Sequence, residues 1–194
     1  MGLKLNATNG GGSVELDVPD TVSSDVVLTL PATDGDANQV LQTNGSGTLS
    51  WSHLYGPSFR AKLSDSQSVG NGEWTTAILN AEDWDTDNCF DTSNGRFTPN
   101  KAGIYYINVQ TYLNYSGGDP NRFGVRVYKN GSWFAGDVTS APNDYWGFAE
   151  LSTLVNFNGS TDYVDLRSYI LGATAGVQML SGYTNMSGFY VRPE

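Results

Sequence analysis

The sequence has very little of the chemistry on which many enzymes and secreted domains depend. Its 194 residues include one cysteine, Cys89, and one histidine, His53. A single cysteine excludes an intrachain disulfide framework, and a single histidine excludes a zinc site built from several histidines. A Ser-His-Asp triad would depend on His53 alone, which lies in the junction after Trp51, so no catalytic residue is predicted there.

Basic residues are also scarce, with 10 Lys and Arg against 20 Asp and Glu and a net charge of −10. Proteins that bind nucleic acid or an anionic membrane surface use clustered Lys and Arg, so neither partner is expected. No apolar run approaches the roughly 20 residues of a spanning helix, and the first residues do not follow the signal-peptide pattern. We therefore expect no membrane insertion.

What the sequence does contain is typical of β-structure. Charged residues make up only 15%, whereas glycine occurs 23 times and aromatic residues reach 12%. Short runs with a period of two alternate with Gly, Asn, Asp and Pro, and Asn130-Gly131 between two such runs is a strong hairpin signal. The expected strands are 103–112, 123–128, 133–138, 148–157, 163–170 and 187–192. Their number and spacing predict an all-β sandwich or barrel.

The first 56 residues differ from the rest. Their alternating runs are short and polar, and Gly-rich turns separate them: 14–18, 26–31, 39–43 and 49–51. Such pieces are too small to bury a hydrophobic core alone, so this segment needs partner chains. Identical copies of the chain are the simplest partners. We expect a fibre-like or shaft-like β segment with its linker over residues 1–56, and a separate head over 57–194.

The head resembles the complement 1q/tumour necrosis factor-like family. The residues that carry the resemblance are Pro57-Ser58-Phe59-Arg60-Ala61, Phe90-Asp91, Asn94-Gly95-Arg96-Phe97-Thr98-Pro99, Gly103-Ile104-Tyr105-Tyr106-Ile107, the pair 151–157 and 162–166, and Ser187-Gly188-Phe189-Tyr190-Val191. The resemblance implies a jelly-roll β-sandwich that assembles as a homotrimer and packs aromatic residues along its three-fold axis.

The aromatic residues of the head alternate along several expected strands. One set fills the sandwich core, and the other would form an exposed patch that soluble proteins avoid unless it is an interface. The expected trimer interface includes Tyr105, Tyr106, Tyr128 and Tyr190. Its contact would be heterologous and would close as a ring.

Residues 1–56 resemble bacteriophage tail-fibre segments, most clearly at 12–16, 28–31 and 39–51. The two resemblances together imply a fibre or spike tip, assembled in the host cytoplasm and exposed on the virion. Its partners would be a host-surface polysaccharide or lipopolysaccharide and, through the N-terminal segment, other virion proteins. The alternatives are a structural capsid or tail decoration or adaptor without its own receptor and, less favoured, a polysaccharide depolymerase.

The connections 113–121, 139–147 and 171–186 are expected at the distal end of the head, because an eight-stranded jelly roll has its two termini at the opposite end. Aromatic rings stack on sugar rings, and Asp or Asn side chains bond to sugar hydroxyls. These connections hold such side chains as candidate saccharide ligands: Tyr115, Asp119, Asn143, Asp144, Tyr145, Trp146 and Tyr183. The alternative is that they form turns and cover the sheet ends.

The densest acidic stretch is 82–88, in which Asp83, Asp85 and Asp87 alternate. Their oxygen atoms offer a Ca²⁺ site, although the stretch lacks the Gly and Glu of an EF-hand loop. A solvated acidic loop is the alternative, and no other cofactor is expected. Hydrolysis would need a pair of carboxylates, and Asp137, Asp144, Glu150 and Asp165 cannot be ranked. Cys89 is expected to be a small buried side chain.

Overall fold

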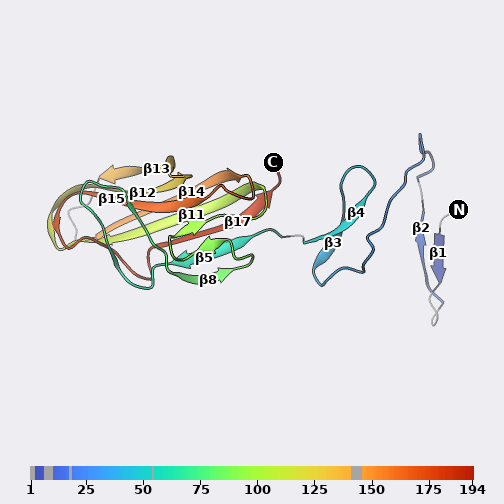
Figure 1. Ribbon diagram of the computed structural model, residues 1–194, viewed down its shortest axis with the longest axis horizontal. Helices are drawn as coiled ribbons and strands as arrows, with labels where there is room; N and C mark the ends of the chain where they lie inside the picture. Colours follow the sequence, from blue (N-terminus) through green and yellow to red (C-terminus); the bar gives the residue numbers. More distant parts are fainter. Residues whose placement is uncertain (1–2, 7–10, 18, 54, 141–145) are drawn as a thin grey trace. The chain divides into compact units, whose positions relative to one another are not determined.

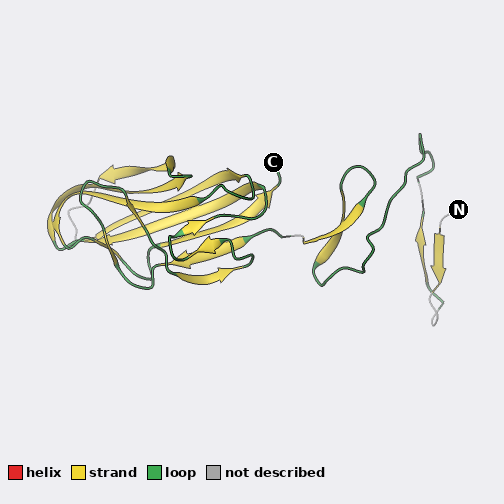
Figure 2. Cartoon of the chain, viewed as in Figure 1, coloured by secondary structure: helices red, strands yellow, loops and turns green. Residues whose placement is uncertain are grey.

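In the computed structural model the chain divides into two compact units, residues 1–54 and 55–194. The division falls two residues before the boundary expected from the sequence. The structure describes residues 3–6, 11–17, 19–53, 55–140 and 146–194, in which every regular element is a β-strand (Figure 2). Among these residues no helix is long and apolar enough to cross a membrane.

The N-terminal unit consists of two hairpins and extended chain. Strand β1 (Leu3–Asn6) pairs with β2 (Ser13–Leu16), and β3 (Gln39–Thr43) pairs with β4 (Leu49–His53). The indole Nε1 of Trp51 donates to the carbonyl of Thr33 at 2.8 Å, and the indole covers Gly35 so closely that a Cβ there would lie 2.7 Å from the ring. None of the side chains described in this unit is buried.

The head is a sandwich of two antiparallel sheets, which we call the β12 sheet and the β11 sheet (Figure 1). The β12 sheet runs β13-β12-β15-β10-β9, with β7 paired to β15. Its strands are β7 (Thr75–Thr76), β9 (Phe90–Asp91), β10 (Arg96–Phe97), β12 (Gly117–Lys129), β13 (Ser132–Ser140) and β15 (Val164–Ala175).

The β11 sheet runs β6-β16-β11-β17-β5-β8, with β14 also paired to β11. Its strands are β5 (Ser58–Lys62), β6 (Gln67–Ser68), β8 (Ala81–Asp85), β11 (Gly103–Asn114), β14 (Trp146–Phe157), β16 (Gln178–Met179) and β17 (Asn185–Arg192). The two sheets therefore leave β13 and β14 as edge strands.

Aromatic rings dominate the core between the sheets. Phe59 stacks on Phe97 at 4.1 Å between ring centroids, and Phe97 meets Tyr105 and Phe157 edge to face at 5.7 and 5.8 Å. Burying each of these side chains contributes about 1.5–3 kcal/mol. The Tyr105 hydroxyl donates to the carbonyl of Lys101 at 2.8 Å, so its polar atom is satisfied although desolvation raises the pKa of the phenol.

The hairpin between β12 and β13 turns at Asn130-Gly131, as the sequence predicts. Both residues have positive φ, 52° and 78°, which is the requirement of a tight primed turn. The carboxylate of Asp162 braces this turn by accepting from Asn130 Nδ2 at 2.7 Å, from Lys129 Nζ at 2.9 Å and from the Asn158 amide at 3.1 Å. The hydrogen bond from Asn130, followed by that from Lys129, lowers the pKa of Asp162.

Replacing Asp162 with Asn is expected to lower the free energy of unfolding at neutral pH by about 1–2 kcal/mol, because a partly exposed charged acceptor is lost. The folded pKa of Asp162 lies below its unfolded value, so this stabilisation is present above an unfolded pKa of about 3.9 and disappears as the pH falls through the folded pKa. Denaturant unfolding of D162N and wild type should therefore differ at neutral pH and converge once the pH falls below the folded pKa of Asp162. E82Q, on exposed β8, is the control; an undiminished difference at low pH would contradict the electrostatic account.

Candidate functional site

The outward side of the β11 sheet carries large apolar side chains. Tyr106 on β11 lies opposite Leu154 on β14 and Phe189 on β17, and the rings of Tyr106 and Phe189 are 5.3 Å apart. Leu154 is 58% exposed and Phe189 is 51% exposed. These values are high for side chains of this size that lie together on one sheet.

A second aromatic group lies farther along the same side. Tyr112 is at its centre, with ring centroids 5.6 Å from Trp146, 6.4 Å from Phe148 and 5.4 Å from Tyr183. Polar side chains lie between the two groups. Among them, Asn108 Nδ2 donates to Glu150 Oε1 at 2.9 Å. We call both groups together the aromatic face, defined by Tyr106, Tyr112, Trp146, Phe148, Leu154, Tyr183 and Phe189.

The four tyrosines expected at a trimer interface do not form one patch. Tyr106 lies on the aromatic face, but Tyr105 is 0% exposed, so placing it at an interface was wrong: alternate residues of β11 point into the core. Tyr190 pairs with Tyr105 on this inner side, and Lys101 Nζ lies 4.1 Å from its ring centroid. Tyr128 belongs to the β12 sheet, where the guanidinium of Arg167 lies 3.9 Å above its ring.

The expected saccharide ligands are likewise divided. Trp146 and Tyr183 belong to the aromatic face, whereas Tyr115 is 4% exposed and packs in the core, which corrects its assignment as a ligand. Asp119 lies in β12, but its side chain is outside the described set, as are residues Asn143, Asp144 and Tyr145. The pairings Asn114–Trp146 and Leu113–Met179 do bring the ends of β11, β14 and β16 together, as the strand count predicts.

The acidic stretch forms a strand rather than a calcium loop. Asp83 on β8 forms ion pairs with Arg60, at 3.5 Å, and with Lys62, whose hydrogen bond lowers the pKa of Asp83. Asp85 Oδ2 accepts from the Phe90 amide at 2.7 Å. In the described part of the chain no three His, Cys, Asp or Glu side chains are close enough to share a metal ion. The site expected from Asp83, Asp85 and Asp87 is therefore not assembled.

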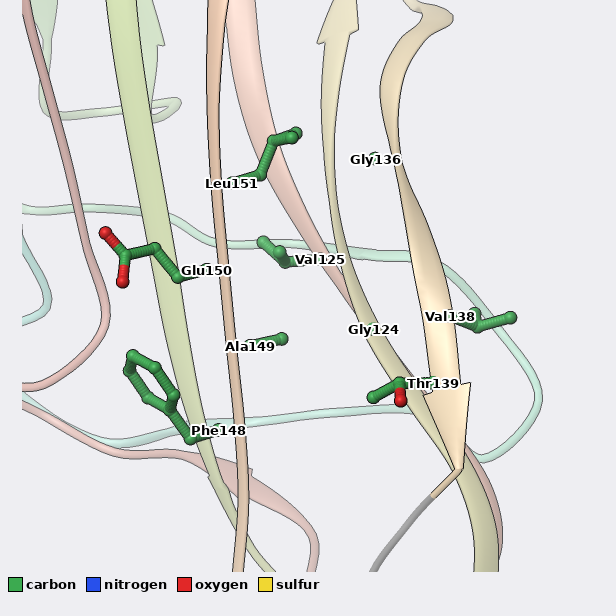
Figure 3. Close-up of a pocket in the computed structure, with 9 residues that line it drawn as sticks. All are labelled: Gly124, Val125, Gly136, Val138, Thr139, Phe148, Ala149, Glu150 and Leu151. Atoms are coloured by element: carbon green, nitrogen blue, oxygen red, sulfur yellow. The ribbon is translucent and has the colours of Figure 1, made fainter.

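A cleft of about 580 Å³ opens between the edge strands β13 and β14 (Figure 3). Val125, Ala149 and Leu151 point into it, whereas Phe148 and Glu150 point away. Asp165 lies on the β12 sheet, buried and bonded to Arg167 Nε at 2.7 Å. Glu150 and Asp165, the two hydrolytic candidates whose side chains the structure describes, thus lie on different sheets.

The sequence analysis missed a group of stacked side chains on the outward side of the β12 sheet. The guanidinium carbon of Arg126 lies 4.0 Å from the ring centroid of Trp74 and 5.1 Å from that of Trp133. Trp74 in turn stacks on Tyr169 at 5.0 Å. The alternation of residues 123–128 does place Arg126 on the outer side, but Trp74 is distant in sequence and its contact is tertiary.

No protein-family model and no curated protein matches the chain. Solved structures do match. The globular domain of zebrafish complement 1qA protein is 15% identical with a TM-score of 0.53, and the match covers 71% of this chain and 99% of that one. Eiger TNF from S. frugiperda is 11% identical with a TM-score of 0.53, covering 72% and 94%. The PRD1 vertex protein P5 is 16% identical with a TM-score of 0.52, covering 71% and 99%.

The head has a jelly-roll fold similar to that of these complement 1q and TNF structures. The fold expected from the sequence is therefore confirmed, and at these identities the similarity concerns the fold alone. The resemblance of residues 1–56 to tail-fibre segments stays a prediction.

Cys89 provides a test of this packing. Its side chain is buried, and burial is the main cause that raises the pKa of its thiol. Because the thiolate is the reactive form, we expect an aromatic disulfide reagent to label the native protein at least about 10-fold more slowly than the denatured protein at mildly alkaline pH. C89A supplies the background signal. Equal labelling rates in the two states would contradict the burial of Cys89.

Proposed function

We propose that the chain is the homotrimeric head of a bacteriophage virion appendage and that it attaches to a saccharide of the host-cell surface. The similarity of its fold to a protein named as a virion vertex component, the PRD1 vertex protein P5, supports a place on a virion. The tail-fibre-like segment 1–56 supports a fibre or spike, which would contact other virion proteins through that segment.

The observation that carries the proposal is the aromatic face. Covering a large apolar side chain is worth about 1.5–3 kcal/mol, and soluble monomers rarely leave several such side chains in one exposed patch. The aromatic face and the cleft between β13 and β14 meet along strand β14, where Phe148 belongs to the aromatic face while Ala149 and Leu151 point into the cleft. A contact between the aromatic face of one chain and the cleft of the next is heterologous, and it forms a closed ring when the rotation between neighbouring chains closes. A trimer is the smallest ring that a heterologous contact can close.

Assembly also explains how weak sites would hold a virion to a cell. Identical sites on one rigid head raise the avidity through effective concentration, and several heads on a particle raise it further. The net charge of −10 gives no long-range attraction to an anionic cell surface. Attachment would therefore depend on short-range stacking and hydrogen bonding.

The second candidate is a capsid or tail decoration or adaptor without its own receptor. The similarity to the PRD1 vertex protein P5 supports a place on a virion. It therefore supports this second candidate as well as it supports an attachment protein. A depolymerase has less support, because Glu150 on β14 and Asp165 on β15 lie on different sheets.

The assembly is tested by placing a charge on the aromatic face. Light scattering of the wild type should give three times the 20.9 kDa chain mass. The double variant L154D/F189D should give single chains with a retained β-sheet circular dichroism spectrum, because buried unpaired carboxylates would oppose association. I78D, at an exposed residue outside the aromatic face, should remain trimeric. A wild type that is monomeric at micromolar concentration would refute the trimer.

Attachment is tested with the trimer itself. Labelled full-length protein should bind intact cells of a susceptible strain saturably, and purified surface polysaccharide of that strain should compete. Since the acidic stretch does not assemble a metal site, a chelator should leave binding unchanged. A stable trimer that binds no strain infected by the phage would replace this function with the decoration or adaptor.

A further inference from the structure

Two arginines face each other on the outward side of the β12 sheet. Arg126 on β12 and Arg167 on β15 are direct partners in the antiparallel register. Like charges in such positions are destabilising, and the chain has only 10 basic side chains in all. Placing two of them side by side lowers the stability of the head. A ligand of opposite charge would offset this repulsion.

The two arginines differ in the groups that balance their positive charge. Arg167 donates to the buried carboxylate of Asp165 at 2.7 and 3.4 Å. Arg126 forms no ion pair with any residue that the structure describes, and its Nε atom is buried without a hydrogen-bond partner. Among the described residues, the guanidinium of Arg126 makes its charge-stabilising contacts with the ring faces of Trp74 and Trp133. An anion at the guanidinium of Arg126 would supply the charged partner that the described residues do not provide.

A third arginine, Arg96, lies on the same sheet as this pair. Arg96 lies between Asp91 and Asp165 in the register, and its guanidinium is 4.1 Å from the ring centroid of Tyr163. Together with Arg126 and Arg167 it sets three guanidinium groups against the two carboxylates. This local excess lies on a chain whose net charge is −10, so it attracts an anion only at short range.

The rings beside Arg126 restrict which anion fits. Trp133 is 60% exposed, so an indole stands open to solvent next to the guanidinium. An indole stacks on the apolar face of a sugar ring, and a guanidinium binds a carboxylate through two parallel hydrogen bonds. An acidic sugar satisfies both groups at once, whereas a neutral sugar leaves Arg126 uncompensated.

We propose that Arg126, Trp133 and Trp74 form a binding site for a carboxylate-bearing sugar of an acidic polysaccharide. This inference rests on the saccharide recognition proposed above and supplies its ligand class and its place. The site lies on the outward side of the β12 sheet, whereas the aromatic face lies on the outward side of the β11 sheet.

The probe is an oligogalacturonate, titrated by calorimetry into the full-length wild-type protein. Its methyl ester keeps the ring and removes the charge, so it should bind at least about 10-fold more weakly, as expected for loss of a charged hydrogen-bonded pair. A phosphorylated neutral oligosaccharide of the same length tests the other common anion. Equal binding of the ester, or tighter binding of the phosphorylated sugar, would overturn the assignment of a carboxylate.

Variants locate the site. R126Q should weaken oligogalacturonate binding by at least about 10-fold, and R126K should also weaken it, because Lys keeps the charge but lacks the two-pronged donor. W133A should weaken it by about 5-fold or more. The matched controls are R122Q, an exposed arginine on the same strand, and W84A, an exposed tryptophan on β8, and both should bind as the wild type does. Normal binding by folded R126Q and R126K would refute the site.

The outcome can be separated from that of the proposed function. Wild-type protein that adsorbs to cells, with R126Q adsorbing equally well, would refute this site and leave the function standing. Wild-type protein that binds oligogalacturonate but adsorbs to no strain would refute the host attachment and leave the site standing.

Discussion

The rest of the head depends on the two-sided pairing of strand β11. This strand pairs with β14 along its whole length on one side and with β17 and β16 on the other, so its register is fixed from both edges. A slip by one residue would exchange every inward side chain for an outward one. The pairing therefore decides at once that Tyr105 packs against Phe97 and Phe157, and that Tyr106 lies beside Leu154 and Phe189.

The two outer surfaces of the sandwich then differ in chemistry. The β11 sheet presents the aromatic face, on which Glu150 is an isolated carboxylate held by Asn108. The β12 sheet presents guanidinium groups stacked on rings, with Arg126 against Trp74 and Arg167 against Tyr128. Apolar surface favours association with protein, and stacked cations beside open indoles favour anions and sugar rings. Under the functions proposed above, the β11 side would serve assembly and the β12 side recognition.

The N-terminal unit obeys a different constraint. Val26, Val27, Leu28 and Leu30 are all exposed, although hydrogen bonds at Thr29 tie this stretch to residues 47–49. Local hydrogen bonds shape the chain here, but none of its described side chains is buried. The absence of buried side chains among its described residues agrees with the expectation that residues 1–56 need partner chains, which stays a prediction.

The sequence by itself determined the all-β class and the Asn130-Gly131 hairpin, because period-two patterns and turn residues act locally, whereas the jelly roll was expected only from the resemblance to the complement 1q/tumour necrosis factor-like family. It also determined that the aromatic residues divide into two sets. Only the tertiary structure decided which set is which, placing Tyr105 and Tyr115 in the core and Trp146 and Tyr183 on the aromatic face. It alone brought Trp74 to Arg126 and turned Asp83 toward Lys62, since such contacts join strands that are far apart in sequence and no local pattern encodes them.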